Sequence, residues 1–332
     1  MKIGFKAFLG GVLVSGMLAT AAHAADKVIV GHFGGPAPFQ MLAKEGKLSA
    51  ATGWDIDWRK FSSGTEVIAA MASGDIVLSE LGSSPFAIAA TQGVDIEAFM
   101  LDFVIGDGEA LVVRDGSGIK TLEDLKGKRI STPVGSTAHF SLMGALKHAG
   151  IKESELTIMN MTPDQILAAW KQDAIDGAYS WPPQQTEMLK NGTLLVGGTQ
   201  VAKWGYPTFN VWVVNKKFAA EHKDELVAFM KAIDDANKAY LKDPAAWGPD
   251  SPEAKAIADQ TGATPETVPE TLAGYTFLPL SDQLAPEWMG GGIATATKDT
   301  AEFLKSAGRI DKVVDDYSGA ITVDYIKAAV GE

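Results

Sequence analysis

The pattern of apolar and polar positions in the first third of the chain alternates between two periods. Short apolar or alternating segments predict strands, and longer segments with apolar residues three and four positions apart predict helices. The predicted strands are 28–32, 54–61, 76–80 and 95–100, and the predicted helices are 38–48, 65–73 and 85–93. Helices between short strands are typical of parallel βαβ units.

The same alternation starts again after an uninterrupted apolar strand, ALVVR, at 110–114. It runs through predicted helices at 121–126, 136–150 and 163–172 and strands at 129–132, 156–160 and 174–179. A second apolar strand at 211–215 closes this block. Beyond it the pattern is mostly helical, at 218–241, 251–260, 265–273 and 289–307.

The two apolar strands therefore bracket a compact α/β unit that is inserted in a larger one. A chain that crosses twice between two lobes has two hinges side by side, which is typical of a clamshell that closes on a ligand. We predict an α/β protein of two lobes joined by two crossing hinge strands. Residues 25–110 and 213–332 form lobe I, and residues 111–212 form lobe II.

The N-terminus has the pattern of an export signal. Lys2 and Lys6 precede an apolar stretch at 8–22, and Ala22-His23-Ala24 follows as a cleavage site. We predict that residues 1–24 are a signal peptide, cleaved after Ala24, and that the mature protein is periplasmic. The roughly 308 remaining residues exceed what one hydrophobic core usually supports, which favours two lobes.

Composition narrows the chemistry. The chain has no cysteine, which excludes disulfides, thiolate metal sites and a cysteine nucleophile. Without Lys2 and Lys6 the formal net charge of −12 becomes −14, which argues against nucleic acid and anionic membranes as partners. The sequence contains no Walker A, G-x-S-x-G or dinucleotide motif. We expect no cofactor, no metal and no enzymatic activity.

Three loop-to-helix junctions carry small residues where strands end. They are the glycine-rich loop 34–38, the turn with Ser83 and Ser84, and the turn with Ser136 and Thr137. Serine or threonine before a helix is an ordinary N-cap. However, ligands of open α/β sheets bind at the carboxyl ends of strands, and helix N-termini bind anions. If the three junctions face one cleft, they form a shell of donors for a tetrahedral oxyanion.

Four further residues are candidates for ligand contact. Glu109 and Asn210 each precede one of the apolar strands, Trp181 ends a strand before two prolines, and His139 begins a helix. Two of them also have a structural interpretation: Asn210 as a turn residue and His139 as a buried structural histidine. A carboxylate such as Glu109 faces a closing cleft only with a cationic partner, because its desolvation is costly.

Several segments, in order along almost the whole mature chain, carry a resemblance. They are DWRKF at 57–61, LGSSP at 81–85, EALVV at 109–113, GKRI at 127–130, ALKH at 145–148, IDGAY at 175–179 and VWVV at 211–214. Together they resemble the periplasmic binding proteins for taurine, aliphatic sulfonates and nitrate that serve ABC transporters. The resemblance implies a type II periplasmic binding fold, a monomer, and delivery of a small sulfonate to a membrane permease in sulfur metabolism.

The implied site has the sulfonate near Ser84, Ser136 and Thr137, and the other end of the ligand near Glu109, Trp181 and Asn210. The sequence departs from the family at Asn210, where the family has an Asp placed to receive an ammonium. A unit charge pair at 4 Å is worth roughly 4 kcal/mol at an effective dielectric constant of 20. Either Glu109 alone binds the ammonium of taurine, or the ligand is isethionate or another alkanesulfonate without a primary ammonium. An enzyme on the same fold, like the thiamine-pyrimidine synthases, would rely on Cys and His clusters and is disfavoured.

Overall fold

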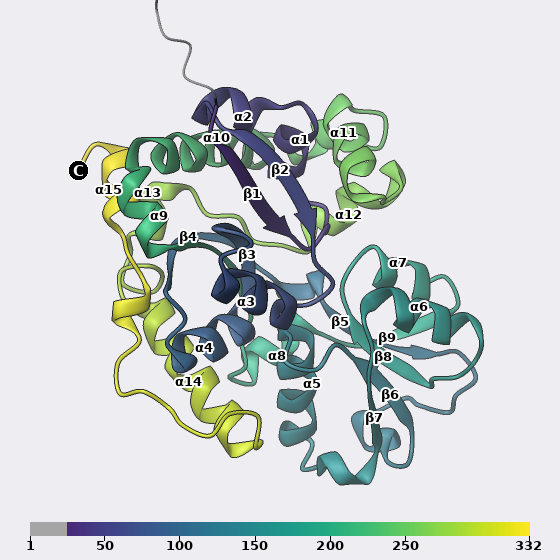
Figure 1. The fold of residues 1–332 in the computed structure, drawn as a ribbon. Coiled ribbons are helices and arrows are strands. Elements are labelled where there is room, and N and C mark those ends of the chain that lie inside the picture. The colour runs from purple at the N-terminus through teal and green to yellow at the C-terminus, as the bar shows by residue number, and fades with distance from the viewer. Residues whose placement is uncertain (1–24) are drawn as a thin grey trace, which may run out of the picture.

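The computed structural model describes residues 25–332, which form two α/β lobes (Figure 1). The predicted signal peptide, residues 1–24, lies outside the described residues. Lobe I contains a five-stranded sheet of order β2-β1-β3-β10-β4, and lobe II contains a five-stranded sheet of order β7-β6-β8-β5-β9. This arrangement confirms the predicted fold class. None of the helices within residues 25–332 is long and apolar enough to span a bilayer.

Lobe I is built from both ends of the described chain. Its strands are β1 (Lys27–His32), β2 (Asp55–Lys60), β3 (Leu78–Gly82), β4 (Ile96–Val104) and β10 (Phe209–Asn215). Its helices are α1 (Pro38–Lys44), α2 (Lys47–Thr52), α3 (Gly64–Ser73), α4 (Ser83–Gln92), α9 (Lys216–Glu221), α10 (Lys223–Lys242), α11 (Pro252–Thr261), α12 (Val268–Ala273), α13 (Leu280–Gln283), α14 (Gly292–Ser306) and α15 (Asp324–Val330). Strand β10 runs antiparallel between β3 and β4, and large apolar side chains such as Trp212 and Phe229 fill the core.

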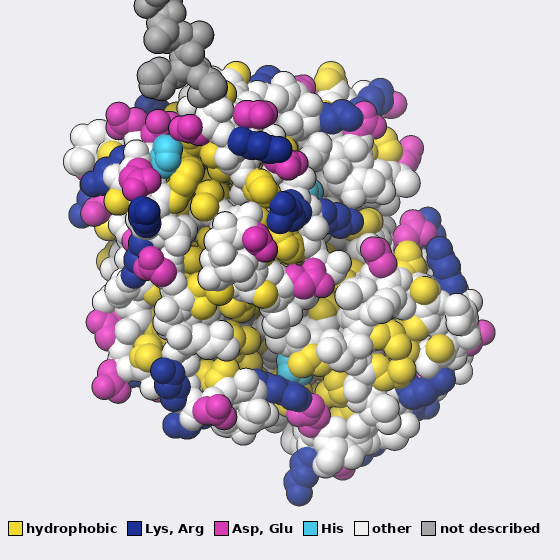
Figure 2. Space-filling view, viewed as in Figure 1, with side chains coloured by type: hydrophobic (Ala, Val, Ile, Leu, Met, Phe, Trp, Pro, Cys, Tyr) yellow, Lys and Arg dark blue, Asp and Glu magenta, His cyan; other side chains and the backbone are white. Residues whose placement is uncertain are grey.

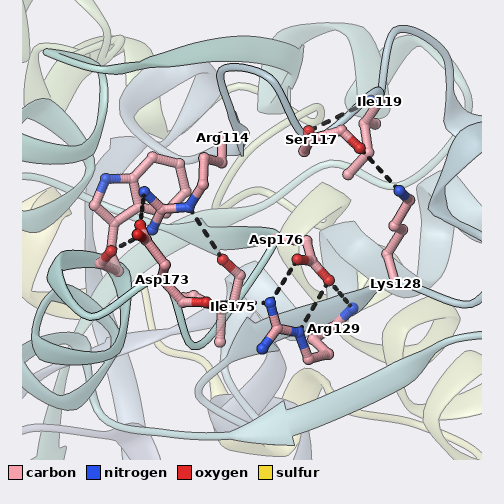
Figure 3. A network of polar contacts seen from close by, with 9 residues as sticks. Arg114, Ser117, Ile119, Lys128, Arg129, Asp173, Ile175 and Asp176 are labelled. Atoms are coloured by element: carbon pink, nitrogen blue, oxygen red, sulfur yellow. Dashed lines mark hydrogen bonds and ion pairs between the residues drawn. The ribbon is translucent and has the colours of Figure 1, made fainter.

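Lobe II is smaller and uses only the central part of the chain. Its strands are β5 (Ala110–Arg114), β6 (Arg129–Thr132), β7 (Thr157–Asn160), β8 (Gly177–Ser180) and β9 (Gly192–Gly197). Its helices are α5 (Thr137–His148), α6 (Pro163–Lys171), α7 (Gln184–Met188) and α8 (Gly198–Lys203). Figure 3 shows polar contacts that join its strands and turns, including the Arg129 guanidinium bonded to both carboxylate oxygens of Asp176 at 2.7 and 3.1 Å.

The two predicted crossing strands are β5, which follows the passage of the chain into lobe II, and β10, which follows its return to lobe I. Strand β5 pairs with β8 and β9 in lobe II, and β10 pairs with β3 and β4 in lobe I. The chain therefore passes between the lobes just before each of these strands, at 105–109 and at 204–208. The lobe limits stay a prediction, and the limit at 212 falls inside β10.

Two long predicted helices are each broken in the structure. The helix predicted over 38–48 divides into α1 and α2 around Gly46, which has a left-handed φ of 68°. The helix predicted over 218–241 divides into α9 and α10 at His222, whose φ of −129° and ψ of 42° are not helical. Strand β4 runs past the predicted end at Met100 to Val104, through the buried acid Asp102.

Acidic and basic side chains are interspersed over the face of the molecule in Figure 2. On this face the negative charge is therefore not gathered at one place. A single acidic patch is not seen on this face.

Candidate functional site

A small cavity lies between the lobes, at the ends of the strands. Its volume is about 50 Å³. Since one ordered water needs about 10–15 Å³ on this measure, the cavity has room for roughly four waters, or a ligand of a few heavy atoms. The lining residues are Phe33, Gly35, Gly64, Glu80, Gly82, Pro85, Phe103, Ile105, Gly108, Glu109, Ser136, Thr137, Trp181, Asn210 and Tyr275.

The N-termini of three helices meet at this cavity. Helix α3 contributes Gly64, α4 contributes Gly82 and Pro85, and α5 of the other lobe contributes Ser136 and Thr137. The first N–H groups of a helix have no partner within the helix, and its dipole is positive at this end. Because the lining residues include no Lys, Arg or His, an anion here would be held by uncharged donors, namely backbone N–H groups, hydroxyls, the Asn210 amide and the Trp181 indole.

The lobes touch across the cavity. Gly82 has ordinary extended angles, φ −71° and ψ 155°, and a Cβ built on it would lie 2.8 Å from Cγ2 of Thr137. Nearby, the Ser84 hydroxyl donates to the carbonyl of Gly135 in lobe II at 3.4 Å. The structure is therefore a closed clamshell in which α4 and α5 approach as closely as a glycine allows.

The predicted serine and threonine residues divide into two groups. Ser136 and Thr137 line the cavity, and the Ser136 hydroxyl also accepts from the backbone N–H of His139 at 3.2 Å, as an N-cap. Ser83 and Ser84 are fully buried outside the lining, where the Ser83 hydroxyl accepts from the N–H of Phe209 at 3.5 Å. The Ser84 hydroxyl bonds to lobe II, and its contact with the sulfonate stays a prediction.

Glu109 lines the cavity and joins the two passages of the chain between the lobes. Its Oε1 accepts from the hydroxyls of Thr208 at 2.7 Å and Ser141 at 2.8 Å. Burial raises the pKa of the Glu109 carboxyl, while the hydroxyls of Thr208, Ser141 and Thr137 lower it. Much of the hydrogen-bonding capacity of Glu109 is thus used within the protein, at the point where the hinge segments meet.

His139 is placed differently from the other candidates. Its Nδ1 accepts from the backbone N–H of Gly135 at 3.3 Å, and the ring is 1% exposed, outside the cavity lining. Burial, and then the nearby charge of Arg309, lower the pKa of His139 to about 4. The imidazole is therefore neutral at physiological pH and holds the turn before α5.

Trp181 and Asn210 both line the cavity, from opposite lobes. Trp181 follows β8 and is half-buried, so one part of the indole faces the cavity and another faces outward. Asn210 lies on β10 with its Oδ1 3.4 Å from the position of a Cβ on Gly82. The structure thus gathers Glu109, Ser136, Thr137, Trp181 and Asn210 around one space, and their roles toward a ligand stay a prediction.

Sequence reasoning missed an acidic and aromatic wall in lobe I. Glu80, 2% exposed, lines the cavity, and its Oε2 accepts from the N–H of Phe33 at 2.8 Å. Behind it lies Asp102, 1% exposed. The rings of Phe103 and Tyr275 stack at 4.2 Å beside them. Each of these acids lies inside a buried strand, Glu80 in β3 and Asp102 in β4, and an acid at such a position could have indicated a site.

A small cavity between two α/β lobes, lined by helix N-termini, defines a two-lobed ligand-binding protein of the type II periplasmic class. The chain belongs to the NMT1/THI5-like family, which matches residues 41–246. It is 40% identical over 290 residues to the taurine-binding periplasmic protein of Escherichia coli strain K12, covering 87% of this chain and 89% of that protein.

Solved structures show the same fold at lower sequence identity. The alkanesulfonate-binding protein SsuA of Xanthomonas axonopodis pv. citri, bound to MOPS, superposes with a TM-score of 0.76 at 22% identity and covers 90% of this chain and 100% of that one. The desulfurization enzyme DSZB superposes with a TM-score of 0.64 at 14% identity, with 92% and 99% coverage. The fold is thus shared by binding proteins and by an enzyme, so function depends on the site.

Proposed function

We propose that the protein is the periplasmic substrate-binding protein of an ABC importer and that it binds taurine or a closely related small sulfonate. The observation that carries this proposal is the meeting of three helix N-termini, from both lobes, at a cavity lined without Lys, Arg or His. A sulfonate is ionised at any biological pH and has three acceptor oxygens, which backbone N–H groups and hydroxyls can satisfy.

A zwitterionic ligand also fits the charge of the chain. The mature protein carries a formal charge of about −14, which repels a free anion at long range but acts little on a molecule with no net charge. The 40% identity to a taurine-binding protein over most of both chains supports the same class of ligand. Export through cleavage after Ala24, a monomeric state and delivery to a membrane permease complete the proposal.

Calorimetric titration of ligand-stripped protein tests the ligand class. The panel is taurine, hypotaurine, isethionate, ethanesulfonate and choline sulfate, and failure to bind any of them would refute the proposal. Thr137→Val keeps the side-chain shape and removes a hydroxyl from the cavity. A hydrogen bond to a charged group is worth about 1.5–3 kcal/mol, so sulfonate affinity should fall by roughly 10–150-fold. Thr157→Val, on an exposed position of β7, is the matched control and should change nothing.

A ligand without a primary ammonium is the second candidate, and the amide at Asn210 favours it. An amide accepts a hydrogen bond from a hydroxyl or amine but offers a cation far less than a carboxylate does. In this case the native protein should prefer isethionate or ethanesulfonate to taurine. Tight binding of taurine together with no binding of neutral-tailed sulfonates would exclude it.

We propose no catalytic role, although DSZB shares the fold. The chain has no cysteine nucleophile, and no histidine lines the cavity among the described residues. The buried imidazole of His139, with its pKa lowered to about 4, accepts from the N–H of Gly135 and is not among the residues that line the cavity. Bound sulfonate recovered after prolonged incubation should be chemically unchanged by NMR, and any consumed ligand would overturn this point.

A further inference from the structure

Two buried carboxyl groups lie in the lobe I wall of the cavity or directly behind it. Glu80 is on β3 and Asp102 is on β4, the two strands that flank β10. The register between β10 and β4 pairs Asn210 with Phe103 and Val211 with Leu101, which leaves Asp102 without a partner. An unpaired residue of this kind is a β-bulge, a device that re-aims a side chain next to a site.

The two carboxyl groups act on each other beyond the effect of burial: the charge of Asp102 raises the pKa of Glu80, and Glu80 lowers the pKa of Asp102. A carboxylate can only accept, so a bond between two carboxyl groups requires one of them to hold a proton. A hydrogen bond between Glu80 and Asp102 would therefore use one shared proton. Among the described residues, Asp102 Oδ2 and the indole Nε1 of Trp212 are both buried without a partner at full hydrogen-bond geometry, and Trp212 lowers the pKa of Asp102, which burial raises.

The protein supplies no cation to this pair. None of the ion pairs within 4.0 Å in residues 25–332 includes Glu80 or Asp102. The titratable groups around the pair are Tyr275 and Glu109 on the cavity wall, and His32, next to the Phe33 N–H that Glu80 accepts from. Burial raises the pKa of the Tyr275 phenol, and burial and then Lys60 lower the pKa of His32 to about 4, so both are neutral near pH 7.

Two buried acids without a cation are costly, because each ionised form loses its hydration. We propose that Glu80 and Asp102 act as one proton-sharing unit that recognises the ammonium group of the ligand, in place of the carboxylate that is missing at Asn210. This inference rests on the proposed function and assigns the cation-binding end of the site. The stacked rings of Phe103 and Tyr275 complete the wall on which an ammonium would rest.

The pair makes binding of a cationic ligand depend on pH. The pKa of Asp102 is raised to about 7 by burial, although Trp212 and Glu80 lower it. The pKa of Glu80 is raised well above its usual range, first by burial and then by the charge of Asp102. Below pH 7 the pair is neutral, so it must release a proton to meet an ammonium. Taurine affinity should then fall toward tenfold for each pH unit below 7, and isethionate affinity should not.

The test is calorimetric titration of taurine and isethionate between pH 5.5 and 8.5 on wild type, Glu80→Gln and Asp102→Asn. Glu123→Gln, an exposed acid of lobe II, is the control and should behave as wild type. We expect Glu80→Gln to lose at least tenfold in taurine affinity at pH 8, with isethionate unchanged within about threefold. Adding Asn210→Asp to Glu80→Gln should restore taurine binding. Buffers of different ionisation enthalpy should show release of a proton with taurine at pH 6.5.

Each failure has a distinct meaning. Equal loss of taurine and isethionate in Glu80→Gln, or a flat taurine profile in wild type, would overturn the role of the pair while leaving sulfonate binding intact. Failure of wild type to bind any sulfonate would instead remove the proposed function. If the variants unfold, carboxyl carbon NMR of the wild type decides between the outcomes. A carboxyl signal that titrates near pH 7 without ligand and no longer titrates with taurine supports the role of the pair. A titration that taurine leaves unchanged refutes it.

Discussion

The contact between Gly82 and Thr137 offers a direct way to block closure without touching the rest of lobe I. Gly82 has φ −71° and ψ 155°, which any residue adopts, so alanine adds no backbone strain. Its Cβ would lie 2.8 Å from Cγ2 of Thr137 in lobe II, whereas the other neighbours are at 3.4 Å or more. Gly82→Ala should therefore penalise the closed form alone.

The size of the penalty follows from that distance. Two carbon atoms reach their best separation at about 3.5–4.0 Å, so the lobes must part by roughly 0.7 Å or more. Overpacking of a close contact costs about 1–3 kcal/mol, and here that cost falls on the closed, ligand-bound form. Ligand affinity should drop by about 5–150-fold, while the stability of the ligand-free protein is retained.

Calorimetry with the best sulfonate of the panel measures the loss, and small-angle scattering with saturating ligand reports whether the lobes close. The rescue is Thr137→Ser in the Gly82→Ala background, because serine keeps the hydroxyl and removes the clashing methyl group. Wild-type affinity in Gly82→Ala, or a double variant as weak as the single one, would refute the steric account.

Three further changes test other contacts. Phe303→Ala removes the ring contacts of α14 with Phe140 and Tyr206 of lobe II, each worth about 0.5–1.5 kcal/mol. Ligand affinity should therefore fall, although Phe303 does not line the cavity. An unchanged affinity in calorimetry would contradict this. Thr208→Val deletes one donor to buried Glu109 and should lower the unfolding free energy by about 1–3 kcal/mol in urea titrations. The Arg129 hydrogen bonds lower the pKa of Asp176, so their stabilisation is present above the unfolded pKa near 4 and is lost as pH falls through the folded pKa. Asp176→Asn should cost about 1 kcal/mol at pH 7 in urea titrations and progressively less in acid.

Local sequence pattern was enough for the two-lobed architecture. Strands such as β5, buried on both faces, appear as continuous apolar runs, and glycine marks the end of several helices. Strand β9 could not be found this way. It is an edge strand, and its exposed and half-buried residues do not alternate with buried ones. The break between α9 and α10 at His222 also depends on packing, with the imidazole stacked on Phe218 at 4.2 Å.

The site was predictable only where it coincides with helix starts. The hydroxyl residues at the start of α5 follow a known local rule, the N-cap, which also places them near an anion site. Gly64 and Tyr275 reach the same cavity from distant parts of the chain, which no local pattern can show. Ser84 fits the local rule as well as Ser136 does, yet the closed lobes bury its hydroxyl against Gly135.

In the proposed arrangement the acids meet one end of the ligand from lobe I alone, whereas the helix N-termini that meet the sulfonate come from both lobes. Glu80 and Asp102 belong to lobe I, whereas the hydroxyls of Ser136 and Thr137 reach the cavity only when α5 of lobe II approaches. A ligand shifts the equilibrium toward the closed form only by the contacts that it makes in that form alone. A simple amine would meet the acids without engaging α5, and a simple alkanesulfonate would leave two buried acids without a counter-charge. Only a molecule with both groups, a short chain apart, stabilises the closed lobes through both.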